Sequence, residues 1–178
     1  MSQIIIYGSK YGTSMKYAEA LSEKLGIPAV SYKEVRNINI YDEVIYIGGL
    51  YAGGVCGMAK TLKKWTLQDN RRLCIVTVGV SDPTEKKNIE CIRGAIKMQL
   101  PEVVYEKAAI FHLRGGIDYS RLNKLHKMMM GMVYKKAKSV PEDKRDAETE
   151  AMIETYNQKV DFVDLLTLSP IIEYFKAK

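Results

Sequence analysis

Short, continuous apolar runs alternate with segments of helical spacing along the first 113 residues. The apolar runs predict five strands, at residues 3–8, 29–32, 43–49, 72–79 and 107–113. The segments between them predict helices at residues 14–25, 58–67 and 85–100. Because the predicted strands are apolar throughout rather than alternately apolar and polar, they indicate a parallel sheet covered by helices on both faces.

The chain after residue 117 has a different pattern. Residues 119–138 carry six basic and no acidic side chains, with leucine, methionine and valine at helical spacing. Residues 141–150 then carry five acidic side chains and resemble an exposed linker. We therefore expect a single domain over residues 1–178 with an insertion at 117–150, a final helix over 148–166 and a C-terminal extension at 167–178.

Composition suits a globular protein of one domain, and the charge balance indicates what it attracts. The 178 residues have a formal net charge of +6 and a pI near 9.1, which favours anionic partners, although a generally basic surface is the simpler alternative. The chain shows no nucleic-acid motif, no signal peptide and no apolar run as long as a membrane span. Three cysteines without metal or redox spacing suit a reducing compartment, so a cytoplasmic protein is expected.

The predicted strands end in loops that are rich in glycine and small polar residues. In a parallel sheet the ligand binds beyond the carboxyl ends of the strands. Here those ends carry the sequences GSKYGTS, GGLYAGGVCG, GVSDPT and RGGIDY. The sequence therefore predicts a binding site at this edge of the sheet.

The first loop has the residues that an anion site needs. A helix N-terminus offers unpaired N–H groups and a positive potential, and glycine permits close approach of the backbone. Ser9, Gly12, Thr13 and Ser14 fit this chemistry. The spacing matches neither a P-loop nor a dinucleotide fingerprint, so it favours a single terminal phosphate. The alternative is a tight strand-to-helix turn that binds nothing.

At this loop the sequence resembles the flavodoxin family, whose pattern is T/S-x-T-G-x-T. Ser9, Gly12 and Ser14 match that pattern, while Tyr11 replaces the usual threonine and removes one hydroxyl donor; Lys10 can offset this loss with its charge. The resemblance implies a flavodoxin-like three-layer α/β fold with a five-stranded parallel sheet of order 2-1-3-4-5. It also implies FMN as the cofactor.

The same resemblance implies which residues contact the flavin ring. The loop after the third strand supplies Leu50, Tyr51, Ala52, Gly53 and Gly54, with Tyr51 as the stacking aromatic. The loop after the fourth strand supplies three further residues at the other edge of the ring, namely Val80, Ser81 and Asp82. The simpler alternatives are an ordinary packed tyrosine at position 51 and a helix cap at Asp82.

The whole chain also resembles the menaquinone-dependent protoporphyrinogen oxidase type of flavodoxin-like protein. This likeness rests on the basic first loop and on the basic, methionine-rich segment at residues 119–138. It implies an FMN-dependent oxidoreductase with protoporphyrinogen as a substrate and a quinone as an acceptor. The alternatives are a soluble FMN electron carrier and a protein of this fold that no longer binds FMN.

The basic segment has three interpretations at this stage. It can be a helix packed on the domain with a solvated basic face, which is the default for an amphipathic stretch. It can lie on an anionic membrane surface, with leucine and methionine in the lipid boundary. It can also be a cationic wall for the carboxylates of a porphyrin.

Overall fold

The computed structural model describes residues 2–51, 53–63, 65–66 and 71–177, and its centre is a parallel sheet. The five parallel strands are listed here in chain order: β1 (Gln3–Gly8), β2 (Ala29–Ser31), β3 (Glu43–Tyr51), β5 (Arg72–Gly79) and β6 (Ala109–Arg114). Their spatial order is β2-β1-β3-β5-β6, and a two-residue strand, β4 (Gly54–Val55), folds back antiparallel on β3. The predicted order 2-1-3-4-5 and the α/β class are confirmed.

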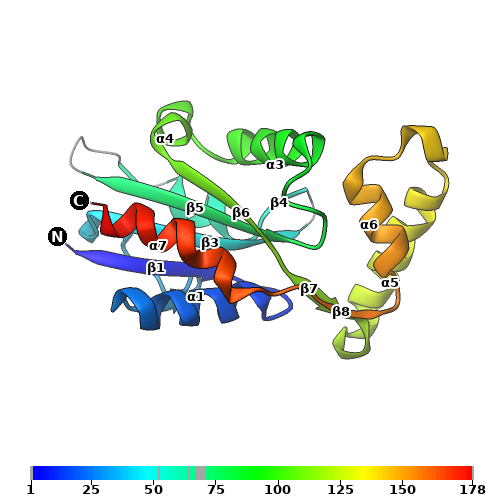
Figure 1. Cartoon of the computed structure of the whole chain (residues 1–178), viewed down its shortest axis with the longest axis horizontal. Helices are drawn as coiled ribbons and strands as arrows, with labels where there is room; N and C mark the ends of the chain where they lie inside the picture. The colour runs from blue at the N-terminus through cyan, green and yellow to red at the C-terminus, as the bar shows by residue number, and fades with distance from the viewer. Residues whose placement is uncertain (1, 52, 64, 67–70, 178) are drawn as a thin grey trace.

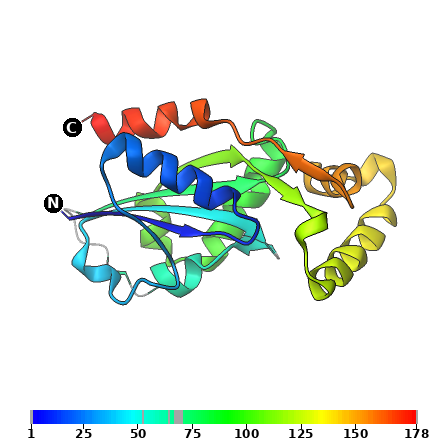
Figure 2. The same cartoon turned by 90° about the horizontal axis from the view of Figure 1, so that it is seen from below.

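Helices cover both faces of the sheet, which makes three layers (Figure 1, Figure 2). One face carries α1 (Thr13–Leu25) and α7 (Ser169–Lys176), whose apolar side chains pack on Ile5, Ile45 and Val76. The other face carries three helices, α2 (Met58–Leu62), α3 (Lys86–Gln99) and α4 (Glu102–Lys107). The strands are therefore buried on both sides, as their continuous apolar sequences require.

Local signals explain most of the helix boundaries. Helix α1 follows Gly12 and ends before Gly26, and both glycines have positive φ angles, 90° and 68°. Helix α2 ends at Leu62, earlier than the predicted 67, and part of that predicted stretch lies outside the described residues. Helix α4 was not predicted, because six residues are too few to show a helical period.

A protruding substructure follows the sheet, and we call residues 116–161 the arm. Two short antiparallel strands form its base, β7 (Gly116–Asp118) and β8 (Lys159–Asp161). Between them run α5 (Lys124–Lys138) and α6 (Ala147–Thr155), with short 3-10 turns at Tyr119–Arg121 and Glu142–Lys144. Figure 2 shows the arm beyond the end of the sheet where the binding loops lie.

The chain after residue 148 differs from the predicted helix over 148–166. Helix α6 ends at Thr155, Asn157 adopts a left-handed conformation with φ 60°, and β8 then pairs with β7. This pairing joins residues about forty positions apart, so a local helical pattern could not reveal it. Residues 167–178, taken from the sequence as an extension, contain α7, whose Ile171 and Phe175 are buried against the sheet.

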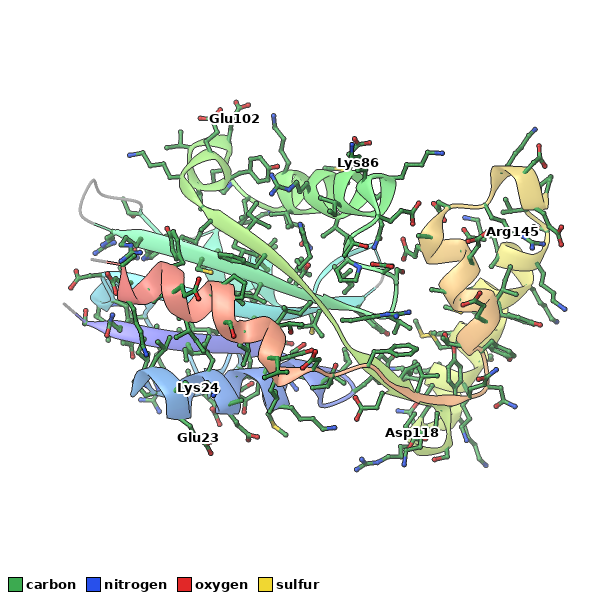
Figure 3. The ribbon with its side chains drawn as sticks, in the orientation of Figure 1. Glu23, Lys24, Lys86, Glu102, Asp118 and Arg145 are labelled. Carbon is green, nitrogen blue, oxygen red and sulfur yellow. The ribbon has the colours of Figure 1, made fainter. Side chains whose placement is uncertain are left out.

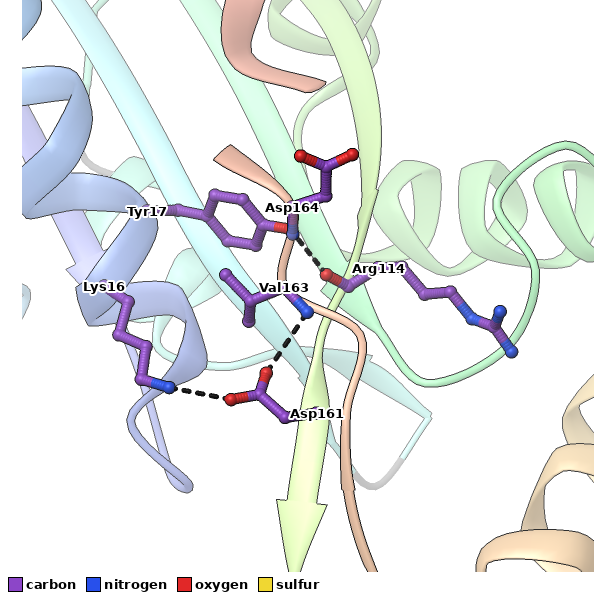
Figure 4. Close-up of polar contacts among 6 residues, drawn as sticks. All are labelled: Lys16, Tyr17, Arg114, Asp161, Val163 and Asp164. Carbon is purple, nitrogen blue, oxygen red and sulfur yellow. Dashed lines mark hydrogen bonds and ion pairs between the residues drawn. The ribbon is translucent and has the colours of Figure 1, made fainter. Parts of the chain in front are cut away.

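Tyr17 holds the base of the arm against the first helix (Figure 4). Its buried hydroxyl donates a hydrogen bond to the Arg114 carbonyl oxygen at 2.7 Å and accepts one from the Asp164 amide at 3.0 Å. The chain enters the arm just after Arg114 and leaves it just before Asp164. An exposed ion pair between Lys16 and Asp161 at 2.9 Å lies beside this contact and contributes little by itself.

We expect Tyr17→Phe to lower the free energy of unfolding by about 1–3 kcal/mol, because the Asp164 amide and the Arg114 carbonyl each lose a hydrogen-bond partner in a part-buried contact. Tyr7→Phe is the matched control: Tyr7 packs on the same core cluster, and its hydroxyl makes no hydrogen bond with the described residues. Denaturant unfolding of both variants measures the difference. Equal stability of the two variants would contradict the role assigned to the Tyr17 hydroxyl.

Candidate functional site

A cavity of about 650 Å³ lies between the carboxyl ends of the strands and the arm. Its sheet side is formed by the first loop, the end of β3 and the loop after β5. Its other walls are formed by α3, α5 and α6. The size suits a cofactor or a small ligand, and the position is the one that the strand directions predict.

The first loop forms one end of this cavity. The Ser9 hydroxyl accepts a hydrogen bond from the Gly12 amide at 2.9 Å, which fixes the turn before α1. The Gly12 carbonyl in turn accepts the first helical hydrogen bond, from Lys16 at 3.1 Å. The amides of the first turn of α1, from Thr13 onward, precede that bond and have no partner within the helix. They form the positive end of α1 beside the cavity.

The Ser14 hydroxyl is buried at this end and has no hydrogen-bond partner. The side chain is 1% exposed and lines the cavity. Among the described residues four buried side-chain polar atoms lack a partner, on Ser14, Trp65, Arg71 and His112, and only Ser14 of these lines the cavity. A buried hydroxyl without a partner is costly. An anion held by the α1 amides would supply the missing acceptor.

Tyr51 and Lys10 lie together at the next part of the wall. The ammonium nitrogen of Lys10 is 5.0 Å from the centre of the Tyr51 ring, within the range of a cation–π contact. The Tyr51 ring also meets His126 of α5 edge to face, with centroids 6.3 Å apart. Tyr51 therefore lies between the first loop and the arm, in contact with both.

Tyr11, which departs from the family pattern, packs toward the arm. It contacts the small apolar cluster of Ile117, Tyr119 and Leu122. Burial, with a smaller contribution from Tyr51, raises the pKa of the Tyr11 hydroxyl. Where the family pattern has a threonine hydroxyl, this chain thus has an aromatic side chain that packs the first loop against the arm.

The loop after β5 closes another side of the cavity. Arg114 donates from Nε to the Val80 carbonyl oxygen at 2.9 Å, which fixes this loop against β6. Asp82 accepts hydrogen bonds from the amide and hydroxyl of Thr84, and these bonds lower the pKa of its carboxyl group. Asp82 therefore closes a local turn and does not cap α3, which begins at Lys86.

Most of the residues predicted for the site line this one cavity. These are the residues in question: Ser9, Lys10, Tyr11, Thr13, Ser14, Leu50, Tyr51, Gly53, Gly54, Val80 and Ser81. Gly12 and Asp82 belong to the same loops but are not among the residues that line it. Ala52 lies outside the described residues.

Two groups of residues outside the predicted site residues also line the cavity. One group is on α3 and includes Asn88, Cys91 and Met98. The other is on the arm: Gly116, Ile117, Tyr119, His126, Met129, Met130, Val133, Glu148, Ala151, Met152 and Thr155. The RGGIDY sequence marked the start of the second group as part of the rim. No local signal indicated that α5 and α6 return toward the strand ends.

Two other kinds of site are not found in the described part of the chain. No group of three or more histidine, cysteine or acidic side chains is placed to hold a metal ion there. No helix among the same residues is both long and apolar enough to cross a membrane. What the cavity offers is one end for an anion and a wide apolar part lined by aromatic and methionine side chains.

Comparison with protein families identifies the class. The sequence model described as "Flavodoxin domain" matches residues 4–144, which is most of the chain. The chain therefore belongs to the flavodoxin domain family. A search of curated proteins finds no significant match.

Solved structures of low sequence identity are similar to this chain. A Fusobacterium nucleatum flavodoxin bound to flavin mononucleotide has a TM-score of 0.44 and 14% identity over 69% of this chain and 75% of that one. Flavodoxin 1 from Bacillus cereus has a TM-score of 0.42 and 11% identity over 63% and 83%. A flavodoxin mutant from Pseudomonas aeruginosa has a TM-score of 0.40 and 14% identity over 78% and 98%.

Proposed function

We propose that this protein binds FMN in the cavity and passes electrons between two reaction partners. The amides of the first turn of α1 and the Ser14 hydroxyl would hold its phosphate. Tyr51 and the loop at Val80 and Ser81 would hold the flavin ring. The observation that carries this proposal is the buried Ser14 hydroxyl, which lines the cavity without a hydrogen-bond partner.

The residues present fit this cofactor in charge and in shape. Lys10 adds a positive charge beside the loop and is exposed, so it can approach a phosphate at small cost. Glycines keep the strand ends open: a Cβ on Gly79 would lie 2.7 Å from the Leu50 side chain, and one on Gly49 would lie 3.2 Å from Ser14 Oγ. Larger residues at these positions would push into the walls of the cavity.

The arm extends the site beyond what a cofactor alone needs. Met129 and Met130 of α5 and Met152 of α6 line the cavity opposite the flavin loops. Methionine side chains adapt to flat apolar molecules of different shape. We therefore assign the arm side of the cavity to the reaction partner, and an apolar ring compound such as a quinone fits this wall.

FMN supplies the two-electron chemistry, and the protein supplies the position and the surroundings. The first loop and α1 would hold the phosphate, Tyr51 would orient the flavin ring, and the arm would keep water from the apolar side of the cavity. None of these roles needs a side chain that donates or removes a proton. The likeness to menaquinone-dependent protoporphyrinogen oxidases supports protoporphyrinogen as the donor and a quinone as the acceptor.

Reoxidation of the reduced protein tests the oxidoreductase part of the proposal. The FMN-loaded protein is reduced without oxygen and mixed with a water-soluble naphthoquinone, and the return of the flavin absorbance band is followed. We expect rapid return with the quinone, and slower return after Met129→Lys and Met152→Lys, which place charges in the apolar wall. If the FMN-loaded protein reacts with neither a quinone nor protoporphyrinogen, the proposed oxidoreductase activity is contradicted. The remaining function would then be that of an FMN electron carrier.

A further inference from the structure

Helix α5 presents an apolar stripe to solvent, on a different face from the one that lines the cavity. Leu125, Met128 and Met132 are 59%, 60% and 57% exposed. Their spacing of three and four residues places them on one side of the helix. The cavity takes the side chains of His126, Met129, Met130 and Val133 instead. The stripe is therefore not explained by the flavin site.

The core of the arm does not use this stripe either. Helix α6 packs on another face of α5, where the rings of Tyr134 and Tyr156 stack with centroids 3.9 Å apart. Tyr156 also meets Tyr119 edge to face at 5.4 Å, and Ala137 is buried. The arm is thus held together by aromatic side chains, and the leucine and the two methionines remain outside.

Charge on the arm is segregated by element. The segment 119–138 holds one arginine and five lysines and no acidic residue, while the acidic residues of the arm's helices and turns lie in 142–154. At 100° per residue, Lys124, Lys135 and Lys136 flank the apolar stripe on its two sides. Among the described residues, none of these three pairs with an acidic side chain.

We propose that this face of α5 docks on an anionic lipid bilayer. Apolar side chains between lysines are the pattern of a helix that lies in the membrane–water interface. The lysines meet lipid phosphates while Leu125, Met128 and Met132 enter the acyl boundary. A purely polar acidic surface would meet only the lysines, whereas a bilayer offers phosphates to the lysines and acyl chains to the three apolar side chains, so the bilayer accounts for more of what is exposed.

Co-sedimentation with vesicles tests this docking. The probes are vesicles of phosphatidylcholine with and without phosphatidylglycerol, at about 0.05 M and about 0.5 M NaCl. We expect binding to the anionic vesicles only, weakened by salt. The affinity should fall at least about tenfold when Lys124, Lys127, Lys135 and Lys136 are changed to Gln. Replacing Leu125, Met128 and Met132 by Gln should weaken binding as much.

Matched controls separate the arm from the overall charge. Lys24 and Lys86 lie on the outer faces of α1 and α3 (Figure 3). The charge control replaces four exposed lysines outside the arm by Gln: Lys24, Lys33, Lys86 and Lys87. The apolar control replaces three exposed residues outside the arm by Gln: Ile40, Val103 and Leu166.

The comparison of vesicle binding between the arm variants and the control variants decides the proposal. Vesicle binding that the control variants keep and the arm variants lose supports it. The proposal is overturned if the wild-type protein does not bind the anionic vesicles. It is also overturned if the charge control loses as much vesicle affinity as the variant with Lys124, Lys127, Lys135 and Lys136 changed to Gln. FMN retention, measured on the same samples, reports the flavin site separately, because none of the substituted side chains lines the cavity.

Discussion

Ser14→Ala is expected to weaken FMN binding about 10- to 100-fold. A hydrogen bond to a charged group contributes about 1.5–3 kcal/mol, and this hydroxyl has no other partner in the described structure. The same change removes an unsatisfied buried group and places a better helix former in α1. The free energy of unfolding without flavin should therefore stay the same or rise. Adding Lys10→Ala should weaken FMN binding further.

Ser22→Ala on the same helix is the matched control. The Ser22 hydroxyl donates a hydrogen bond to the Ile27 carbonyl oxygen at 2.6 Å and does not line the cavity. Its loss should cost about 1 kcal/mol of stability and leave FMN affinity unchanged. Calorimetric titration with FMN and denaturant unfolding measure both quantities. If Ser14→Ala binds FMN as tightly as the wild-type protein does, the assignment of the phosphate site to the first loop is wrong.

Gly8→Ala should destabilise the protein by about 3 kcal/mol and weaken FMN binding as well. A Cβ on Gly8 would overlap the carbonyl oxygen of Cys56 and lie 3.1 Å from the Tyr46 hydroxyl oxygen. The backbone at Cys56 cannot move away as a flexible side chain can, so overpacking should be severe. The displaced segments are the start of the first loop and the loop next to Tyr51, which form two sides of the cavity.

Gly94→Ala tests whether any added methyl has this effect. Gly94 lies in α3 and lines the cavity, so it serves as a control for stability alone, and a Cβ there would meet no heavy atom within 4 Å. Alanine in this helix should raise stability by about 0.5–1 kcal/mol. Thermal unfolding of both variants gives the comparison. A Gly8→Ala protein as stable as the wild type would show that the contact between β1 and Cys56 is not as tight as described.

The sheet and the position of the first loop at the cavity could be predicted because their signals are local. Each buried parallel strand is a continuous apolar run, and the order 2-1-3-4-5 follows from the resemblance that the first loop supports. The loop at Ser9–Ser14 combines small and hydroxyl residues between a strand and a helix, so its chemistry is also visible in a few residues. These predictions needed no knowledge of contacts far apart in the chain.

An insertion at 117–150 was predicted, but the fold of the arm was not, because the contacts that define it are long-range. The β7–β8 pairing joins Gly116 to Asp161. The α5 periodicity predicted a helix, but not that one face lines a cavity while the neighbouring face stays exposed. From the sequence, Tyr11 shows only that the threonine hydroxyl of the family pattern is absent. Its contact with the apolar cluster of the arm is visible only in the structure. Likewise, Asp82 fitted a helix cap by sequence and closes a turn before the helix instead.

Comparing FMN with riboflavin tests the central claim most directly, since the two molecules differ only in the phosphate. Calorimetric titration of the flavin-free protein gives both dissociation constants under the same conditions. The site described here predicts that FMN binds at least about 100-fold more tightly, because the α1 amides and the Ser14 hydroxyl act on the phosphate. Equal affinity for the two molecules would contradict a phosphate site at Ser9–Ser14.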